Sequence, residues 1–145
     1  MSLNKEELAY SAGFFDGEGC IGVGGIKTIA KSVTARVYNA HKEPLEFFKG
    51  AFGGKIHHKK RSLQNAHWSD MYEWVLCGRN SEEFLQKILP YLRIKHAEVE
   101  IALKLIDTFK PKWKTGYYRL SEEGLKRRAQ LTEEMREVKA QICRR

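Results

Sequence analysis

The fold of this chain is decided by the stretch Leu8-Ala9-Tyr10-Ser11-Ala12-Gly13-Phe14-Phe15-Asp16-Gly17-Glu18-Gly19. Its small residues Ala9, Gly13 and Gly17 recur at every fourth position, so they share one face of a predicted helix. Glycine inside a helix costs about 1 kcal/mol relative to alanine, so two glycines on one face predict that another backbone approaches closely. Asp16 and Glu18 stand at the C-terminal end of this helix, where the helix dipole disfavours acids. A carboxylate in such a position is expected to meet a cation.

This stretch resembles the sequence motif of the LAGLIDADG homing endonucleases. Gly13, Asp16 and Gly19 match letters of the motif, Glu18 replaces its second aspartate, and Ser11 replaces its leading leucine. Phe14 and Phe15 stand where the motif has two aliphatic residues. A second likeness is the basic segment Leu92-Arg93-Ile94-Lys95, which resembles a family segment that precedes a helix and supplies a lysine near the cleavage centre. The resemblance covers residues 3 to about 109.

Length and composition are those of a single domain, 1–145, with 42% apolar residues to fill its core. No segment approaches the roughly 18 apolar residues of a membrane span, and no signal peptide opens the chain. We therefore expect an intracellular protein without a membrane partner, whether organellar, prokaryotic or from a phage. Its three cysteines show neither zinc-ligand spacing nor a disulfide framework, which favours a reducing compartment. The 26 basic and 18 acidic residues leave a charge of +8, which indicates a polyanionic partner or ordinary solubility charge.

Hydrophobic spacing and turn residues predict the order of helices and strands. The first helix has Asn4 as its N-cap, with Glu7 completing a capping box. The other expected elements are strands at 20–29 and 32–39, a helix at 43–52, strands at 55–61 and 71–77, and helices at 81–92, 97–109 and 121–142, the first and last of these capped by Ser81 and Ser121. This order fits the α+β fold that the resemblance implies. That fold has an αββαββα core with a saddle-shaped antiparallel sheet, over about 3–109, followed here by a C-terminal helical extension at about 120–143.

Glu18 is the expected metal ligand. Phosphodiester cleavage uses divalent ions, and Mg²⁺ binds one or two carboxylates together with waters and substrate oxygens, so one acid in each chain can suffice. The resemblance implies that the backbone carbonyl of Gly17 is a further ligand, and that two or three Mg²⁺ ions are shared across a homodimer. It also implies that the two motif helices pack through Ala9, Gly13, Phe14 and Gly17. Asp16 is expected to orient helix ends instead of binding metal, and a helix end with solvated acids is the alternative reading.

Two further residues receive catalytic roles from the resemblance. Lys95 is expected to stabilise charge on the phosphate or on the attacking water, with Arg93 in reserve and an ordinary surface lysine as the alternative. Asn39, at the end of the second strand, falls where the family often has a polar residue that positions water.

A basic surface for DNA is predicted on the second and third strands. Alternation places Lys55, His57, Lys59 and Arg61 on one face of the third strand. Arg36 and Tyr38, together with Thr34, extend this surface, which fits a DNA major groove or is simply solvated. Gly22 and Gly24 either let the backbone approach DNA or mark a bulge.

Aromatic residues outside these strands have mixed expectations. The segment 110–119 interleaves bases with Trp113 and Tyr117, so it either tracks phosphates or connects two helices with its aromatics packed on the core. The side chains expected in the core are Phe47, Phe48, Trp68 and Trp74.

The resemblance implies a sequence-specific, homodimeric, Mg²⁺-dependent DNA endonuclease, intron-encoded and of the homing type. Such an enzyme cuts both strands of double-stranded DNA across the minor groove and leaves 3′ overhangs. Two alternatives stay open on the sequence alone. The first is a non-cleaving nucleic-acid-binding protein on the same fold, such as an intron-splicing maturase or a transcription regulator. The second is a dimeric interaction module that binds no nucleic acid.

Overall fold

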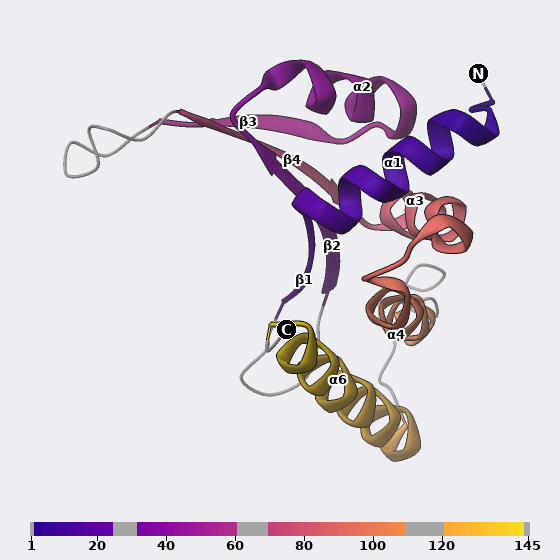
Figure 1. Ribbon diagram of the computed structural model, residues 1–145. Coiled ribbons are helices and arrows are strands. Elements are labelled where there is room, and N and C mark those ends of the chain that lie inside the picture. Colours follow the sequence, from indigo (N-terminus) through magenta and orange to yellow (C-terminus); the bar gives the residue numbers. More distant parts are fainter. Residues whose placement is uncertain (1, 25–31, 61–69, 110–120, 144–145) are drawn as a thin grey trace.

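The computed structural model describes residues 2–24, 32–60, 70–109 and 121–143, and it has the predicted α+β architecture. In chain order the elements are α1 (Lys5–Glu18), β1 (Gly19–Gly24), β2 (Ser32–Asn39), α2 (Lys42–Phe52), β3 (Lys55–Lys59), β4 (Met71–Cys77), α3 (Arg79–Ile88), the short 3-10 helix η2 (Leu89–Tyr91), α4 (His96–Asp107) and α6 (Glu122–Cys143) (Figure 1). Parts of the predicted strands 20–29 and 55–61 lie outside the described residues, as do Trp68 and the segment 110–119.

The four strands form one antiparallel sheet in the order β1-β2-β4-β3. The alternation predicted for β2 is confirmed, since Val33, Ala35 and Val37 are buried while the residues between them are half-buried. The buried face of the sheet is covered by helices, with α1 crossing it diagonally and α2 lying along β3 and β4 (Figure 1). The opposite face carries the alternate residues of each strand.

Aromatic side chains fill the core between sheet and helices. Phe48 from α2, Trp74 from β4 and Phe84 from α3 are buried, and their ring centroids lie 5.1 to 6.0 Å apart. The indole Nε1 of Trp74 donates a hydrogen bond of 2.9 Å to the carbonyl of Gly53, so the buried polar atom is satisfied. The predicted core roles of Phe48 and Trp74 are thus confirmed, and Phe47 is half-buried against the same cluster.

The helix caps agree with the sequence at two ends and differ at a third. Asn4 accepts a hydrogen bond of 2.8 Å from the Glu7 N–H, and Ser121 accepts one of 3.1 Å from the Gly124 N–H. The prediction that Ser81 caps α3 is wrong, because the helix begins at Arg79 and its N-cap is Gly78, at φ 67°. The buried Ser81 hydroxyl donates to the Gly78 carbonyl at 2.6 Å. Within the predicted span 81–92 the α-helix ends at Ile88, and Pro90 lies in η2 because proline has no N–H to continue the α-helical pattern.

The last helix, α6, lies along α4 and ties it to the edge strand β1. The buried Arg128 donates a hydrogen bond of 2.7 Å to the Thr108 carbonyl, and its guanidinium lies 4.6 Å from the centre of the Phe109 ring. Burial lowers the pKa of this guanidinium. Further along, the Lys139 ammonium pairs with the buried Glu98 at 3.3 Å and donates to the carbonyl of Ile21. The C-terminal extension is therefore part of the packed domain.

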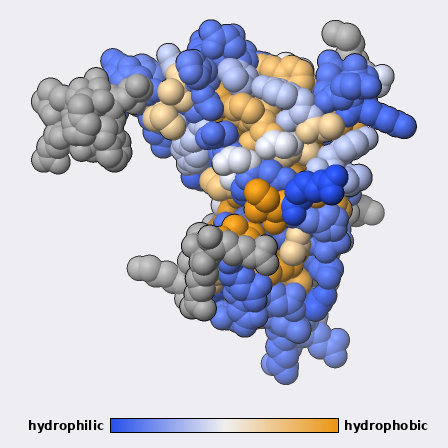
Figure 2. Space-filling view, in the orientation of Figure 1, coloured by the Kyte–Doolittle hydropathy of each residue, from blue (hydrophilic) through white to orange (hydrophobic). Residues whose placement is uncertain are grey.

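The surface is mostly hydrophilic, with an exception in the middle of the face that α1 crosses. Figure 2 shows apolar side chains exposed there, between hydrophilic elements above and below. None of the described helices is long and apolar enough to cross a membrane.

Candidate active site

The site is built around the end of α1. Gly19 ends the helix with extended backbone and its N–H donates to the carbonyl of Phe15. A Cβ at Gly19 would come within 2.3 Å of the buried Phe15 ring, so only glycine lets the chain pass from helix to strand directly over this ring. Glu18 is thereby fixed as the last helical residue.

The Glu18 side chain is exposed and makes no hydrogen bond or ion pair with any residue in the described ranges. Its neighbour Gly17 is exposed too. A carboxylate and helix-end carbonyls are hard oxygen donors, which is the donor set that Mg²⁺ prefers. No group of three or more His, Cys, Asp or Glu side chains gathers as a metal site within those ranges. Glu18 therefore fits a divalent ion as one ligand among several, together with helix-end carbonyls, waters, substrate oxygens or a carboxylate of a second chain.

Asp16 joins the end of α1 to the start of α4. Its carboxylate accepts hydrogen bonds from the backbone N–H groups of Arg93 at 2.7 Å, Ile94 at 3.2 Å and Lys95 at 2.9 Å. These N–H groups lie at the N-terminal end of α4, where a negative charge is favourable. The expectation that Asp16 orients helix ends is confirmed.

Lys95 is the N-cap of α4, and its side chain reaches the C-terminal end of α1, where Glu18 lies. Its ammonium donates to the backbone carbonyl of Asp16, and the side chain is half-buried. Both the backbone N–H and the side chain of Lys95 are therefore tied to Asp16. The reserve candidate Arg93 is exposed, and only its backbone N–H contacts Asp16.

We predict that Asp16→Ala lowers the free energy of unfolding by about 3 kcal/mol, because three partly buried N–H groups lose a charged acceptor. Asp16→Asn should lose less, since one acceptor oxygen remains. Urea denaturation measures both changes. The control is Glu83→Ala, which removes an exposed carboxylate of α3 and should leave the urea midpoint nearly unchanged. Equal midpoints for Asp16→Ala and the control would contradict this role.

Asn39 lies at the end of β2, as predicted, and makes a local contact there. Its side-chain oxygen accepts a hydrogen bond of 2.8 Å from the N–H of His41, which shapes the turn into α2. Alternation along β2 places Asn39 on the helix-covered side with Val37. Among the described residues Asn39 makes no hydrogen bond with Glu18 or Lys95.

The strip of small residues on α1 faces outward. Ala9, Gly13 and Gly17 are exposed, and a Cβ added at either glycine meets no atom within 4 Å. Packing inside this chain therefore does not require glycine at these two positions. Phe14 does not share the strip, because its ring is half-buried and packs 5.7 Å from the ring of Phe48.

On the open face of the sheet, three of the predicted DNA contacts converge on a buried acid, Glu73 of β4. The Tyr38 hydroxyl donates a hydrogen bond of 2.6 Å to Glu73 Oε1. The Lys59 ammonium lies 3.2 Å from Glu73 Oε2, and Arg36 Nη1 lies 3.7 Å from Oε1. Glu73 is only 5% exposed. Sequence reasoning missed this residue, although its place between Tyr72 and Trp74 puts it on the same face of the sheet as the basic side chains.

This cluster fixes the charge state of its members. Burial alone would raise the pKa of Glu73, but the hydrogen bond from Tyr38 and the charges of Lys59 and Arg36 outweigh it and hold the pKa below its usual value. The hydrogen bond to Glu73, together with burial, raises the pKa of Tyr38, partly offset by the nearby Arg36. At neutral pH the cluster thus contains an ionised carboxylate and a protonated phenol.

The remaining predicted DNA contacts are exposed or lie outside the described residues. Lys55 and His57 are exposed on β3, and Arg61 falls in the part that is not described. The strand β1 keeps regular pairing through Gly22 and Gly24, so the bulge alternative is wrong. A Cβ at Gly22 would come within 2.5 Å of the Thr34 hydroxyl, which occupies this space from the neighbouring strand.

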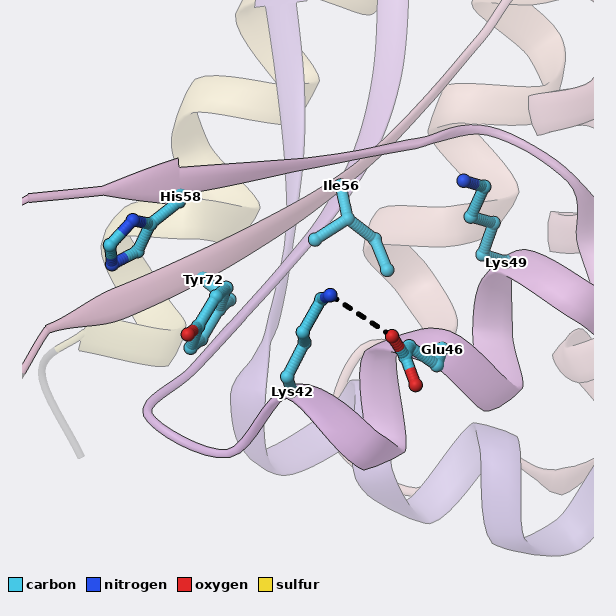
Figure 3. Close-up of a pocket in the computed structure, with 6 residues that line it drawn as sticks. All are labelled: Lys42, Glu46, Lys49, Ile56, His58 and Tyr72. Atoms are coloured by element: carbon cyan, nitrogen blue, oxygen red, sulfur yellow. Dashed lines mark ion pairs between the residues drawn. The ribbon is translucent and has the colours of Figure 1, made fainter.

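A separate hollow of about 410 Å³ lies on the helix-covered side of the sheet, between α2 and the strands β3 and β4 (Figure 3). Lys42 and Glu46 face each other there and form an ion pair of 3.1 Å, and His58 stacks on Tyr72 while bonding Asp70 at 3.1 Å. Among the described residues that line the hollow, Glu46 is the only carboxylate, and it is paired with Lys42. The hollow is therefore a weaker candidate for metal chemistry than the end of α1.

Solved structures with similar folds include homing endonucleases bound to DNA. I-CvuI in complex with its target, in the presence of Ca, has a TM-score of 0.67 at 23% identity, with 93% of this chain and 85% of that chain covered. The archaeal intron-encoded I-Vdi141I complexed with DNA has a TM-score of 0.70 at 19% identity, covering 92% of this chain and 84% of that one. I-SmaMI, bound to uncleaved DNA with calcium ions, has a TM-score of 0.59 at 22% identity, and the match covers 96% of this chain but 48% of that chain.

No protein-family model and no curated protein matches this sequence. The antiparallel sheet, the motif helix α1 that crosses it and the similarity to these structures agree with one another. The chain has the fold of the LAGLIDADG homing endonucleases.

Proposed function

We propose that this protein is a sequence-specific, homodimeric DNA endonuclease of the homing type, which hydrolyses both strands with divalent metal ions and leaves 3′ overhangs. The observation that carries the proposal is the exposed carboxylate of Glu18 at the end of α1, which pairs with none of the described residues, with the ammonium of Lys95 held at the Asp16 carbonyl of the same helix end. The similar structures I-CvuI and I-SmaMI are DNA complexes in the presence of Mg or Ca.

At the cleavage centre, Glu18 and the Gly17 carbonyl would hold Mg²⁺, which when bound activates water and stabilises the leaving oxygen. Lys95 cannot move freely, because Asp16 binds both its backbone N–H and its ammonium. A pre-positioned cation at this point stabilises negative charge that develops on the phosphate. Asp16 itself, with its oxygens occupied by three N–H groups, acts by positioning.

A second copy of the chain completes the site in this proposal. Among the described residues, Glu18 is the exposed carboxylate at the end of α1, and the strip Ala9, Gly13 and Gly17 leaves room for another helix to approach. The exposed large side chains Tyr10 at 48% and Ile94 at 58% add apolar surface beside α1. The structural match to I-SmaMI covers most of this chain but about half of that chain, as expected if two units of this fold make one nuclease.

The open face of the sheet is the proposed DNA surface. Lys55 and His57 are exposed there, and the half-exposed Arg36 and Lys59 surround the buried Glu73. A two-stranded ribbon with basic side chains fits the major groove, where arginine and lysine read guanine edges and phosphates.

The proposal is tested by selecting bound duplexes from a randomised pool and then incubating the selected DNA with Mg²⁺. We expect a two-fold symmetric site that is cut in both strands, with binding that weakens steeply as salt rises. Selected DNA that stays intact in Mg²⁺ would instead support the non-cleaving DNA-binding protein. Failure to enrich any duplex at low salt would overturn both readings.

A further inference from the structure

We infer that Glu73 is a specificity-positioning residue, which commits the Tyr38 hydroxyl to one hydrogen-bonding direction so that Tyr38 reads bases bearing an amino group. This inference rests on the proposed function, since it concerns the same DNA surface. Glu73 stands on a central strand, paired in register with Tyr38 of β2 on one side and with His57 of β3 on the other.

Glu73 is placed to brace its neighbours and not to contact DNA itself. It is 5% exposed, one of its oxygens accepts the Tyr38 hydroxyl at 2.6 Å, and the other lies 3.2 Å from the Lys59 ammonium. A carboxylate this enclosed and occupied cannot accept a further hydrogen bond from a base. Its partners remain accessible, with 41% of the Arg36 side chain and 56% of the Lys59 side chain exposed.

The brace fixes which partner is a donor and which is an acceptor. A tyrosine hydroxyl has one O–H donor and two acceptor lone pairs, and here the donor points at Glu73. The Tyr38 hydroxyl can therefore only accept a hydrogen bond from a ligand, and Arg36 lies next to it. Arg36 and Lys59 have donors only, and the 3.7 Å separation of Arg36 Nη1 from Glu73 is an ion pair too long for a hydrogen bond.

In the major groove these assignments discriminate between bases. The N6 amino group of adenine and the N4 amino group of cytosine are donors, whereas guanine O6 and thymine O4 are acceptors. An acceptor-only Tyr38 matches adenine or cytosine and repels the other two. Arg36 and Lys59 match guanine or a phosphate. Glu73 therefore fixes the direction of the one adaptable group, the Tyr38 hydroxyl, between two side chains that can only donate.

The test compares duplexes selected by the parent protein, Glu73→Gln, Tyr38→Phe and the double variant. The base pair that Tyr38 contacts is the one where Tyr38→Phe changes the selection. There the parent should prefer adenine or cytosine about tenfold, the size expected of one good base contact. Glu73→Gln should reduce this preference to about twofold, because an amide lets the phenol turn its O–H outward. The double variant should equal Tyr38→Phe, since both changes act through one hydroxyl.

A matched control is Glu83→Gln, which removes one negative charge from an exposed position on α3 and should select the parental sites. Circular dichroism checks that each variant is folded. If Glu73→Gln does not fold, Tyr38→Phe decides, because it leaves the Glu73–Lys59 pair intact and must still lose the preference. Parental selection at every position by folded Glu73→Gln or by Tyr38→Phe overturns the inference while the proposed function stands. A parent protein that enriches no duplex overturns both.

Discussion

Replacing Glu18 by glutamine should reduce cleavage of the selected duplex by about 10³-fold while leaving DNA binding intact. Glutamine keeps the shape of the side chain but removes the negative charge that a divalent ion needs. Binding should persist or tighten, because a carboxylate no longer repels the phosphates. Single-turnover cleavage in Mg²⁺ and binding in Ca²⁺ measure the two effects separately, since Ca²⁺ should support binding without efficient cutting.

Two companions make this result specific. Glu83→Gln removes an exposed carboxylate on α3 and should cut at the parental rate. Lys95→Met should slow cutting less severely than Glu18→Gln, since the metal ligands stay in place. Addition of EDTA should stop cleavage by every active variant. A Glu18→Gln protein that cuts both strands as fast as its parent would place the metal site elsewhere.

The second large effect is expected from Gly13→Leu, which should convert a dimer to a monomer and abolish cleavage. Within one chain the substitution has room, because a Cβ at Gly13 meets no atom within 4 Å. Leucine is also a better helix former than glycine, so the free energy of unfolding of one chain should stay the same or rise by about 0.5–1 kcal/mol. Light scattering gives the oligomeric state, and urea denaturation gives the stability.

The chain provides a matched control in α2. Gly50 is also an exposed helical glycine whose added Cβ would meet nothing within 4 Å. Gly50→Leu should give a similar gain in helix stability but leave the dimer and the cleavage rate unchanged. An intact, active dimer of Gly13→Leu would remove the α1 strip from the interface.

The end of α1 was predictable because its determinants are local. The capping box of Asn4 and Glu7 and the closely spaced glycines lie within fifteen or so residues, on the scale where helix signals operate. The expectation for Asp16 came from electrostatics, since an acid at a helix C-terminus needs compensation. Its partners, 77 to 79 residues further on, are known only from the fold.

The cluster around Glu73 was missed because its contacts join residues that are far apart in the sequence. Tyr38 and Glu73 are 35 residues apart, and alternation within each strand cannot say which strands become neighbours. Alternation predicts basic side chains on one strand face, but it does not show that Arg36 and Lys59 share a carboxylate with each other. The start of α3 was missed at shorter range, because a positive φ at Gly78 lets the helix begin before its serine.

The contacts of Asp16 also bear on how this protein can evolve. All three of its carboxylate hydrogen bonds go to backbone N–H groups, at Arg93, Ile94 and Lys95, and every residue except proline has one. The anchor therefore makes no demand on the side chains of the segment it holds. A combinatorial library, or natural drift, can vary positions 93 and 94 while the segment stays in place. New chemistry beside the end of α1 is thus open to selection without a loss of architecture.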